Sequence, residues 1–291
     1  MRLNMFYEIY KTTIKNLFRS VIFWLSFLII IGITIFSVSQ GHRIMSDTAI
    51  GIMIRDTDPR YVMNFEYYII DIFNVFNSKI MLHSIPIFSI ISTAIILAHN
   101  HRDEFFEIEK ASGINLAKYT FGKILAILSI NLIITLIVVH IGVHFYVHIC
   151  GGVEYMGTFM YISDSAVRIL RLVLFQAMPT ITMYVGITYL VGTVFKSVFP
   201  AAITSIGYVV FYFSGMFVLR NRIVPIYFDY FSPSPRKLVD YLYYYDSAFF
   251  EWYINSRETS FGKAAFCVLF LVAVGATGIL ISYLLTRKRD K

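Results

Sequence analysis

The sequence predicts an all-α polytopic membrane protein that has six transmembrane helices and keeps both termini in the cytosol. Hydrophobic residues make up 57% of the 291 residues and charged residues only 15%, and the apolar residues gather in six long runs. A soluble domain carries about 25% charged residues, so we expect most of this chain to be surrounded by lipid. A backbone inside a bilayer must satisfy its own hydrogen bonds, which makes each run a helix.

The chain is predicted to consist of an amphipathic interfacial helix, residues 1–20, and a six-helix transmembrane domain, residues 21–291. A run of about 20 apolar residues is enough to cross about 30 Å of hydrocarbon. Long outer segments, residues 39–79 and 220–263, precede the second and the last crossing. The crossings themselves are expected at residues 21–38, 80–98, 124–149, 169–194, 198–219 and 264–285.

Basic residues set the predicted orientation of these helices. Lys11, Lys15 and Arg19 precede the first crossing, and Arg287 and Lys288 follow the last one. With the N-terminus inside, the short inner segments are net positive and the longer outer segments are close to neutral, as the positive-inside rule expects. The formal net charge of +7 is therefore a signal of topology, and no nucleic-acid partner is expected.

The first twenty residues show the pattern of an amphipathic helix, because their basic residues fall away from an apolar face. Such a helix lies in the inner membrane interface, with its basic side toward anionic lipid headgroups. Two roles stay open for it: a simple membrane anchor, or a lever that a cytosolic partner moves. The apolar positions at helical spacing are Leu3, Phe6, Tyr7, Tyr10, Ile14, Leu17 and Phe18.

The most distinctive cytosolic feature is the charged segment of residues 99–123, between the second and third crossings. An acidic cluster that also carries aromatic residues comes first, and Lys110 follows it. Gly113 is expected to end this short helix, and Asn115 to cap the next one. Such a helix is suited to insert into a groove of another protein and to carry a push into two transmembrane helices.

On these residues the chain resembles the permease subunits of ABC transporters of the ABC-2 exporter type. The resemblance covers nearly the whole chain and is most specific in two places. One is the stretch A-S-G-I-N-L-A-K-Y-T-F-G-K, residues 111–123, after the acidic cluster, and the other is V-G-T-V-F-K-S-V-F-P, residues 191–200. Family members commonly carry E-x-G-T and a later L-P before the turn into the third crossing, whereas here the G-T is missing and Gly113 stands where the proline usually is.

The resemblance implies a complex of two membrane halves, this chain and a second permease that is identical or homologous, with two separate ABC ATPase subunits. ATP and Mg²⁺ would bind the ATPase subunits, and closure of the ATPase dimer would open an outward path for export. The expected substrate is a hydrophobic or amphipathic peptide, drug or lipid-linked molecule, and the expected location is a bacterial plasma membrane. The residues implied to couple to the ATPase are Asp103, Glu104, Phe105, Glu107, Glu109 and Lys110.

This chain is not expected to be an enzyme or to hold a cofactor of its own, since it contains no G-x-x-x-x-G-K-S/T motif. Two other classes of function stay open: a secondary transporter, and a membrane sensor or immunity protein for an extracellular peptide. A secondary transporter tends to show inverted repeats and buried carboxylates. The predicted crossings contain no Asp or Glu and no clear repeat.

Polar residues within the crossings form a second candidate site. His140, His144 and His148 recur every four residues on one face of the third crossing, toward the outer leaflet. Ionisable residues in membrane helices usually face protein or water. Three interpretations stay open: they line a polar translocation path, they hydrogen-bond to neighbouring helices, or they bind a metal ion. No Cys, Asp or Glu accompanies them, so no metal site is assigned, and Asn131 and Gln176 are further candidates for the path.

Overall fold

The computed structural model describes residues 2–47, 84–102, 115–149, 172–195, 199, 206–207 and 261–289. Within these residues the protein is all-helical, as predicted, and has no strand. The short π-helix η3, Leu172–Ala177, runs directly into the helix that follows it. The α-helices are α1 (Arg2–Arg19), α2 (Val21–Asp47), α5 (Ile85–Arg102), α7 (Leu116–Ile149), α9 (Met178–Phe195) and α14 (Phe261–Arg289).

Four of the described helices are long and apolar enough to cross a membrane. Their spans are Val21–Ser39, Leu116–Gly142, Met178–Phe195 and Val268–Arg287, and α5 adds the shorter apolar stretch Ile85–Ala98. The multi-pass helical class is therefore confirmed for this part of the chain. The predicted crossing at residues 198–219 lies outside the described residues, apart from Phe199, Ile206 and Gly207, as do most residues of the two predicted outer segments.

Three helices, α2, α7 and α14, are longer than the crossings predicted from hydropathy, and two of them differ most clearly. α2 continues to Asp47, and α7 begins at Leu116, eight positions before the expected start at residue 124. Hydropathy drops at Lys118 and Lys123, but neither residue breaks a helix. Asn115 caps α7 as predicted, because its side-chain oxygen accepts a hydrogen bond from the Ala117 amide at 2.9 Å.

The fourth crossing begins with the wider turns of η3. Pro179 follows two residues later, near the start of α9. Proline has no N–H to donate, and its ring crowds the carbonyl four residues earlier. A π-helical turn relieves that crowding at Pro179. Pro86, the second residue of α5, likewise stands two residues after a π-helical residue, Ser84.

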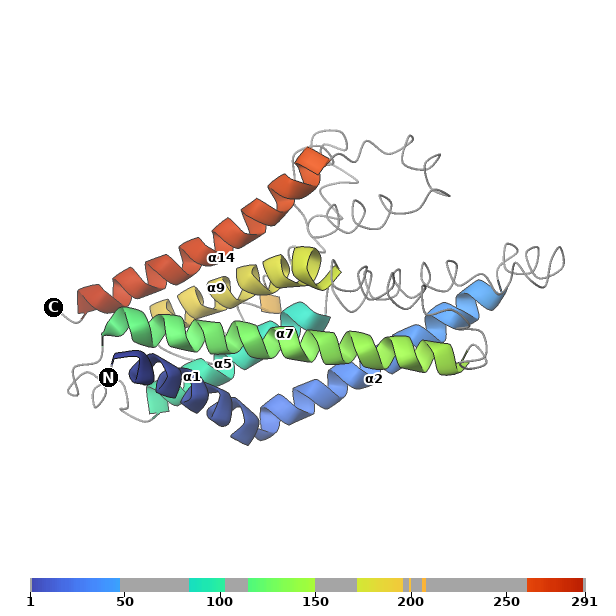
Figure 1. Ribbon diagram of the computed structural model, residues 1–291, viewed down its shortest axis with the longest axis horizontal. Helices are drawn as coiled ribbons and strands as arrows, with labels where there is room; N and C mark the ends of the chain where they lie inside the picture. Colours follow the sequence, from blue (N-terminus) through green and yellow to red (C-terminus); the bar gives the residue numbers. More distant parts are fainter. Residues whose placement is uncertain are drawn as a thin grey trace.

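The helices lie side by side, and both ends of the chain lie at the same end of the bundle (Figure 1). We call this end the terminal end. α5, α9 and α14 run toward it, whereas α2 and α7 run away from it (Figure 1). α9 and α14 are thus parallel, and the contacts between them agree, since Gly275 lies against Thr182 and Gly278 against Gly186.

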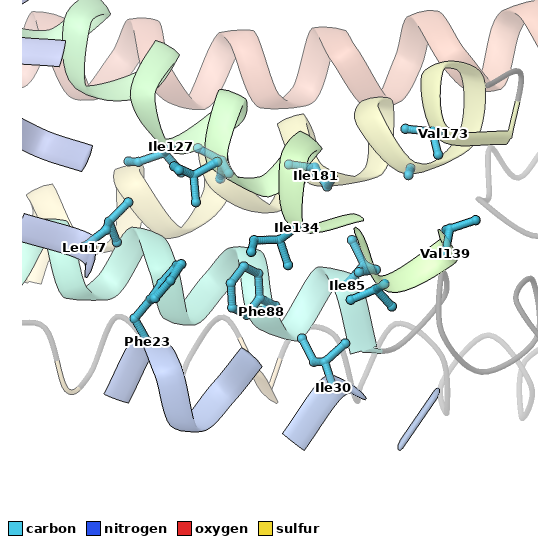
Figure 2. Packing of buried hydrophobic residues seen from close by; sticks show 14 of the residues in the cluster. Leu17, Phe23, Ile30, Ile85, Phe88, Ile127, Ile134, Val139, Val173 and Ile181 are labelled. Atoms are coloured by element: carbon cyan, nitrogen blue, oxygen red, sulfur yellow. The ribbon is translucent and has the colours of Figure 1, made fainter. Parts of the chain in front are cut away.

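A continuous apolar core fills the space between α2, α5, α7 and α9. Phe23, Phe88, Ile127 and Ile181 are almost fully buried in it and converge from these four helices (Figure 2). In lipid such a core is held by close packing, since hydrocarbon chains are as apolar as the side chains themselves. Leu17 of α1 belongs to the same core, so α1 is a part of the bundle.

Candidate functional site at the terminal end of the bundle

The predicted ATPase-coupling residues are attached to two described helices. Asp103, Glu104, Phe105, Glu107, Glu109 and Lys110 all lie outside the described residues. α5 ends just before them at Arg102, and α7 begins just after them at its Asn115 cap. Both helix ends lie at the terminal end (Figure 1), so a force on residues 103–114 would act directly on α5 and α7.

α1 packs along the first turns of α7, close to that attachment point. A Cβ atom placed on Gly122 would lie 3.0 Å from Cγ2 of Ile9 and 3.6 Å from Cε2 of Phe6. Ile9, Thr13 and Leu17 are buried along the same side of α1. The amphipathic helix is therefore present, but it packs its apolar side against protein, where the sequence predicts a helix lying in the membrane interface. Gly122 makes this possible because a larger residue would hold α1 away from α7.

The opposite side of α1 is exposed and net positive. Glu8, Lys11, Lys15 and Arg19 lie on it, and the three basic residues recur every four positions. Tyr7 is also exposed on this side. Such a row of charge at the terminal end is suited to attract anionic headgroups or an acidic surface of a partner.

An aromatic cluster fixes the junction between α1 and α2. Ser20 is the single non-helical residue there, and its amide bonds to the Leu17 carbonyl at 3.0 Å. The indole N–H of Trp24 donates to the Phe18 carbonyl at 2.8 Å. The rings of Phe18 and Phe23 meet edge to face at 5.5 Å, and Phe23 continues the contact to Phe88 of α5, also at 5.5 Å. The rings hold α1 and α2 together across Ser20 and tie both to α5.

A second set of contacts, nearer the terminal end, joins α5, α7, α9 and α14. Lys123 is buried, lies 3.7 Å from the centre of the Tyr119 ring and donates a hydrogen bond to the Tyr119 hydroxyl. Thr120 shares a side-chain hydrogen bond with Tyr189 of α9. Tyr189 in turn packs with apolar residues of α5, α7 and α14, namely Leu97, Ile124, Leu128 and Ile279. Movement of the first turns of α7 would thereby be felt by each of these helices.

Asn131, a predicted residue of the translocation path, lies fully buried between α5 and α7. Its oxygen Oδ1 accepts from the Ser89 hydroxyl at 3.0 Å. Its Nδ2 group donates to the Ser92 hydroxyl at 3.0 Å and to the Ile127 carbonyl at 2.8 Å. Both amide hydrogens and the amide oxygen are engaged, so Asn131 joins two helices of one chain in this structure. We call Asn131, Ser89 and Ser92 the asparagine clamp.

The other predicted path residues lie farther from the terminal end. His140 and His144 are exposed on α7, and their ring centres are 4.3 Å apart. His148 and Gln176 belong to α7 and η3, but their side chains lie outside the described residues. Within the described part of the chain, the structure brings only the two histidines together.

The sequence did not single out the closest helix contact, which joins α9 and α14. A Cβ on Gly275 would lie 2.6 Å from the carbonyl carbon of Thr182, and one on Gly278 would lie 2.7 Å from the Gly186 oxygen. Three glycines thus let two backbones touch, as small residues commonly do in membranes. We call Gly186, Gly275 and Gly278 the glycine contact. Small residues at such spacing, Thr182 with Gly186 and Gly275 with Gly278, are the signal that points to it.

Comparison with protein-family models, with curated proteins and with solved structures finds no match for this chain. The function is therefore argued from the residues and the contacts above. The contacts nearest the terminal end are those of α1 with Gly122 and those around Tyr189.

Proposed function

We propose that this chain is the membrane-spanning permease subunit of an ABC exporter of the ABC-2 type. It works with two separate ABC ATPase subunits, which bind ATP and Mg²⁺, and with a second permease that is identical or homologous. The exported substrate is a hydrophobic or amphipathic peptide, drug or lipid-linked molecule. The complex resides in a bacterial plasma membrane, with both termini of this chain in the cytosol.

One observation carries the proposal: α1 packs against the first turns of α7, the helix that directly follows the acidic segment of residues 103–114 in the chain. Gly122 receives α1 seven residues after the Asn115 cap, where the acidic segment ends. A partner that binds the acidic segment at the terminal end would therefore act on α1 and α7 together. Such convergence is expected of a protein that receives force from outside the membrane.

The directions of the helices also support six crossings. α9 and α14 run parallel, toward the terminal end (Figure 1). Two parallel membrane helices in one chain require an odd number of crossings between them, and the apolar residues 198–219 supply one. With that crossing, both termini lie on one side of the membrane, as the basic residues predict.

In the proposed mechanism the partner ATPase contacts Glu104, Glu107 and their neighbours when ATP closes the ATPase dimer. The acidic side chains pair with basic residues of the ATPase and guide its approach, since such pairs add more to encounter and orientation than to affinity. The push reaches α5 and α7 through their cytosolic ends and α2 through α1 and the Ser20 junction. The asparagine clamp keeps α5 and α7 moving as one unit.

The test is co-purification of the tagged chain with the ABC ATPase encoded beside it. The double charge reversal Glu104→Lys and Glu107→Lys is expected to lower the recovered ATPase roughly tenfold, because like charges across an interface repel. Glu258→Lys is the matched control, since it lies in the predicted outer segment and is expected to leave recovery unchanged.

Two outcomes would refute the proposal. The first is substrate movement by the purified chain in vesicles with no ATPase present, which would indicate a secondary transporter. The second is failure of the ATPase to co-purify with the unaltered chain. Equal recovery from the unaltered chain and from the double charge reversal would instead remove only the acidic segment from the contact.

A further inference from the structure

Two imidazole rings face each other on an exposed side of α7. The ring centres of His140 and His144 are 4.3 Å apart, and the ring planes are inclined by 75°. Both side chains are exposed, and within the described residues neither makes a hydrogen bond or an ion pair with another side chain. They are thus available to a ligand from outside this chain.

The pair lies near the membrane boundary that is opposite to the terminal end. The apolar span of α7 runs from Leu116 to Gly142, so it includes His140 and ends before His144. The apolar run of α7 begins at residue 124, and at about 1.5 Å per residue His140 lies about 24 Å and His144 about 30 Å along the helix from there. Because the hydrocarbon of a bilayer is about 30 Å thick, the pair lies at its outer edge, where water and dissolved ions reach His144.

We infer that His140 and His144 bind a divalent transition-metal ion such as Cu²⁺ or Zn²⁺, through one nitrogen of each ring. Imidazole suits these ions. A metal about 2.0–2.1 Å from two nitrogens in a tetrahedral arrangement places the ring centres about 5 Å apart. The 4.3 Å found here is close to that separation, and small rotations of exposed side chains close the difference.

The alternatives explain the arrangement less well. Hydrogen bonding to a neighbouring helix needs a partner group, and the described residues provide none for either ring. Two nitrogen ligands leave the remaining coordination positions of the ion to water. The inference is independent of the proposed transport function.

The experiment uses the full chain, purified in detergent through a tag without histidine, stripped by a chelator and titrated with Cu²⁺. Electron paramagnetic resonance then counts the imidazole nitrogens that couple to the copper. We expect at least two coupled imidazoles in the unaltered chain. His140→Ala and His144→Ala are each expected to remove one of them and to weaken binding roughly tenfold, as for loss of a group that supports a metal site.

Two further variants separate this pair from the other histidines. His99→Ala, near the end of α5 and far from the pair, is expected to change neither the spectrum nor the affinity. His148→Ala is expected to retain two coupled imidazoles. Unchanged copper affinity in the double variant His140→Ala and His144→Ala would overturn the inference, and so would a spectrum of the unaltered chain with fewer than two coupled imidazoles.

Discussion

The asparagine clamp and the glycine contact both join two helices, but they do so by opposite means. Between α5 and α7, Asn131 adds hydrogen bonds to Ser89 and Ser92. Between α9 and α14, three glycines remove side chains so that the backbones meet. In lipid neither contact gains from burial of apolar surface, so both rely on hydrogen bonds and dispersion. The comparison teaches that the α5–α7 contact is lost when the Asn131 side chain is removed. The α9–α14 contact is lost when a side chain is added to one of its glycines.

The two contacts also differ in what surrounds them. α5 and α7 are held further by α2, α9 and the rest of the apolar core. α14 packs mainly against α9. On its other sides Leu269, Leu280 and Leu284 are exposed. Loss of the glycine contact should therefore cause the larger damage, since few other contacts would keep α14 in place.

The largest effect is expected from Gly275→Val. The added Cβ would lie 2.6 Å from the Thr182 carbonyl carbon and 2.9 Å from the Met183 amide nitrogen. Both neighbours are backbone atoms, so no side-chain rotation relieves the clash, and we expect a loss of about 3 kcal/mol or failure to fold. Unfolding of the detergent-purified chain by sodium dodecyl sulfate measures the change.

Gly32→Val is the matched control for that substitution. Gly32 lies in α2, and a Cβ there would meet nothing within 4 Å. Valine forms helices better than glycine, so this variant should be as stable as the unaltered chain. If both valine variants were equally stable, the prediction that the backbones of α9 and α14 touch at Gly275 would be wrong.

A smaller effect is expected from Asn131→Leu. This substitution removes two hydrogen bonds between α5 and α7 and keeps a side chain of similar size. Interhelical hydrogen bonds in membranes average about 0.6 kcal/mol each, with a maximum of about 1.7 kcal/mol, so we expect a loss of about 1–2 kcal/mol in the same assay. Thr135→Val is the control, because the hydrogen bond that the Thr135 hydroxyl makes in the described structure stays within its own helix, to the Asn131 carbonyl. Equal stability of the two variants would show that the asparagine clamp does not hold α5 and α7 together.

The smallest effect is expected from Gly122→Ala, which refines the comparison. Here the three atoms nearest to the added Cβ belong to side chains: Cγ2 and Cβ of Ile9 at 3.0 and 3.4 Å and Cε2 of Phe6 at 3.6 Å. We expect a loss of about 1 kcal/mol. Ile9→Ala should make the same change nearly harmless, so the double variant should be more stable than the sum of the single losses predicts. Strict additivity would show that α1 does not lie against Gly122.

Features that depend on local chemistry were predictable from the sequence. The break at Ser20 follows from the change of pattern between α1 and α2, and the Asn115 cap follows from its position before an apolar run. Helix lengths were less predictable, because hydropathy reports where lipid begins and not where a helix begins. α7 thus starts at Leu116, ahead of its apolar run.

Contacts between residues far apart in the sequence could not be predicted from this one sequence. Asn131 is visible as a polar residue in a crossing, but only the fold shows that Ser89 and Ser92 face it. Gly122 and Gly275 look alike in sequence, yet one meets a side chain and the other a backbone. The role of Glu104 and Glu107 stays a prediction, since these residues lie outside the described part of the chain.

The Ser20 junction has a mechanical consequence. α1 has 18 residues and α2 has 27, which correspond to arms of about 27 Å and about 40 Å. If α1 is the lever that a cytosolic partner moves, the rings on both sides of Ser20 would make the two arms turn as one body about that residue. A displacement of 2 Å at the free end of the short arm would then become about 3 Å at the far end of the long arm. The Ser20 junction would then act as a pivot that turns a small motion on one side of the membrane into a larger motion on the other side.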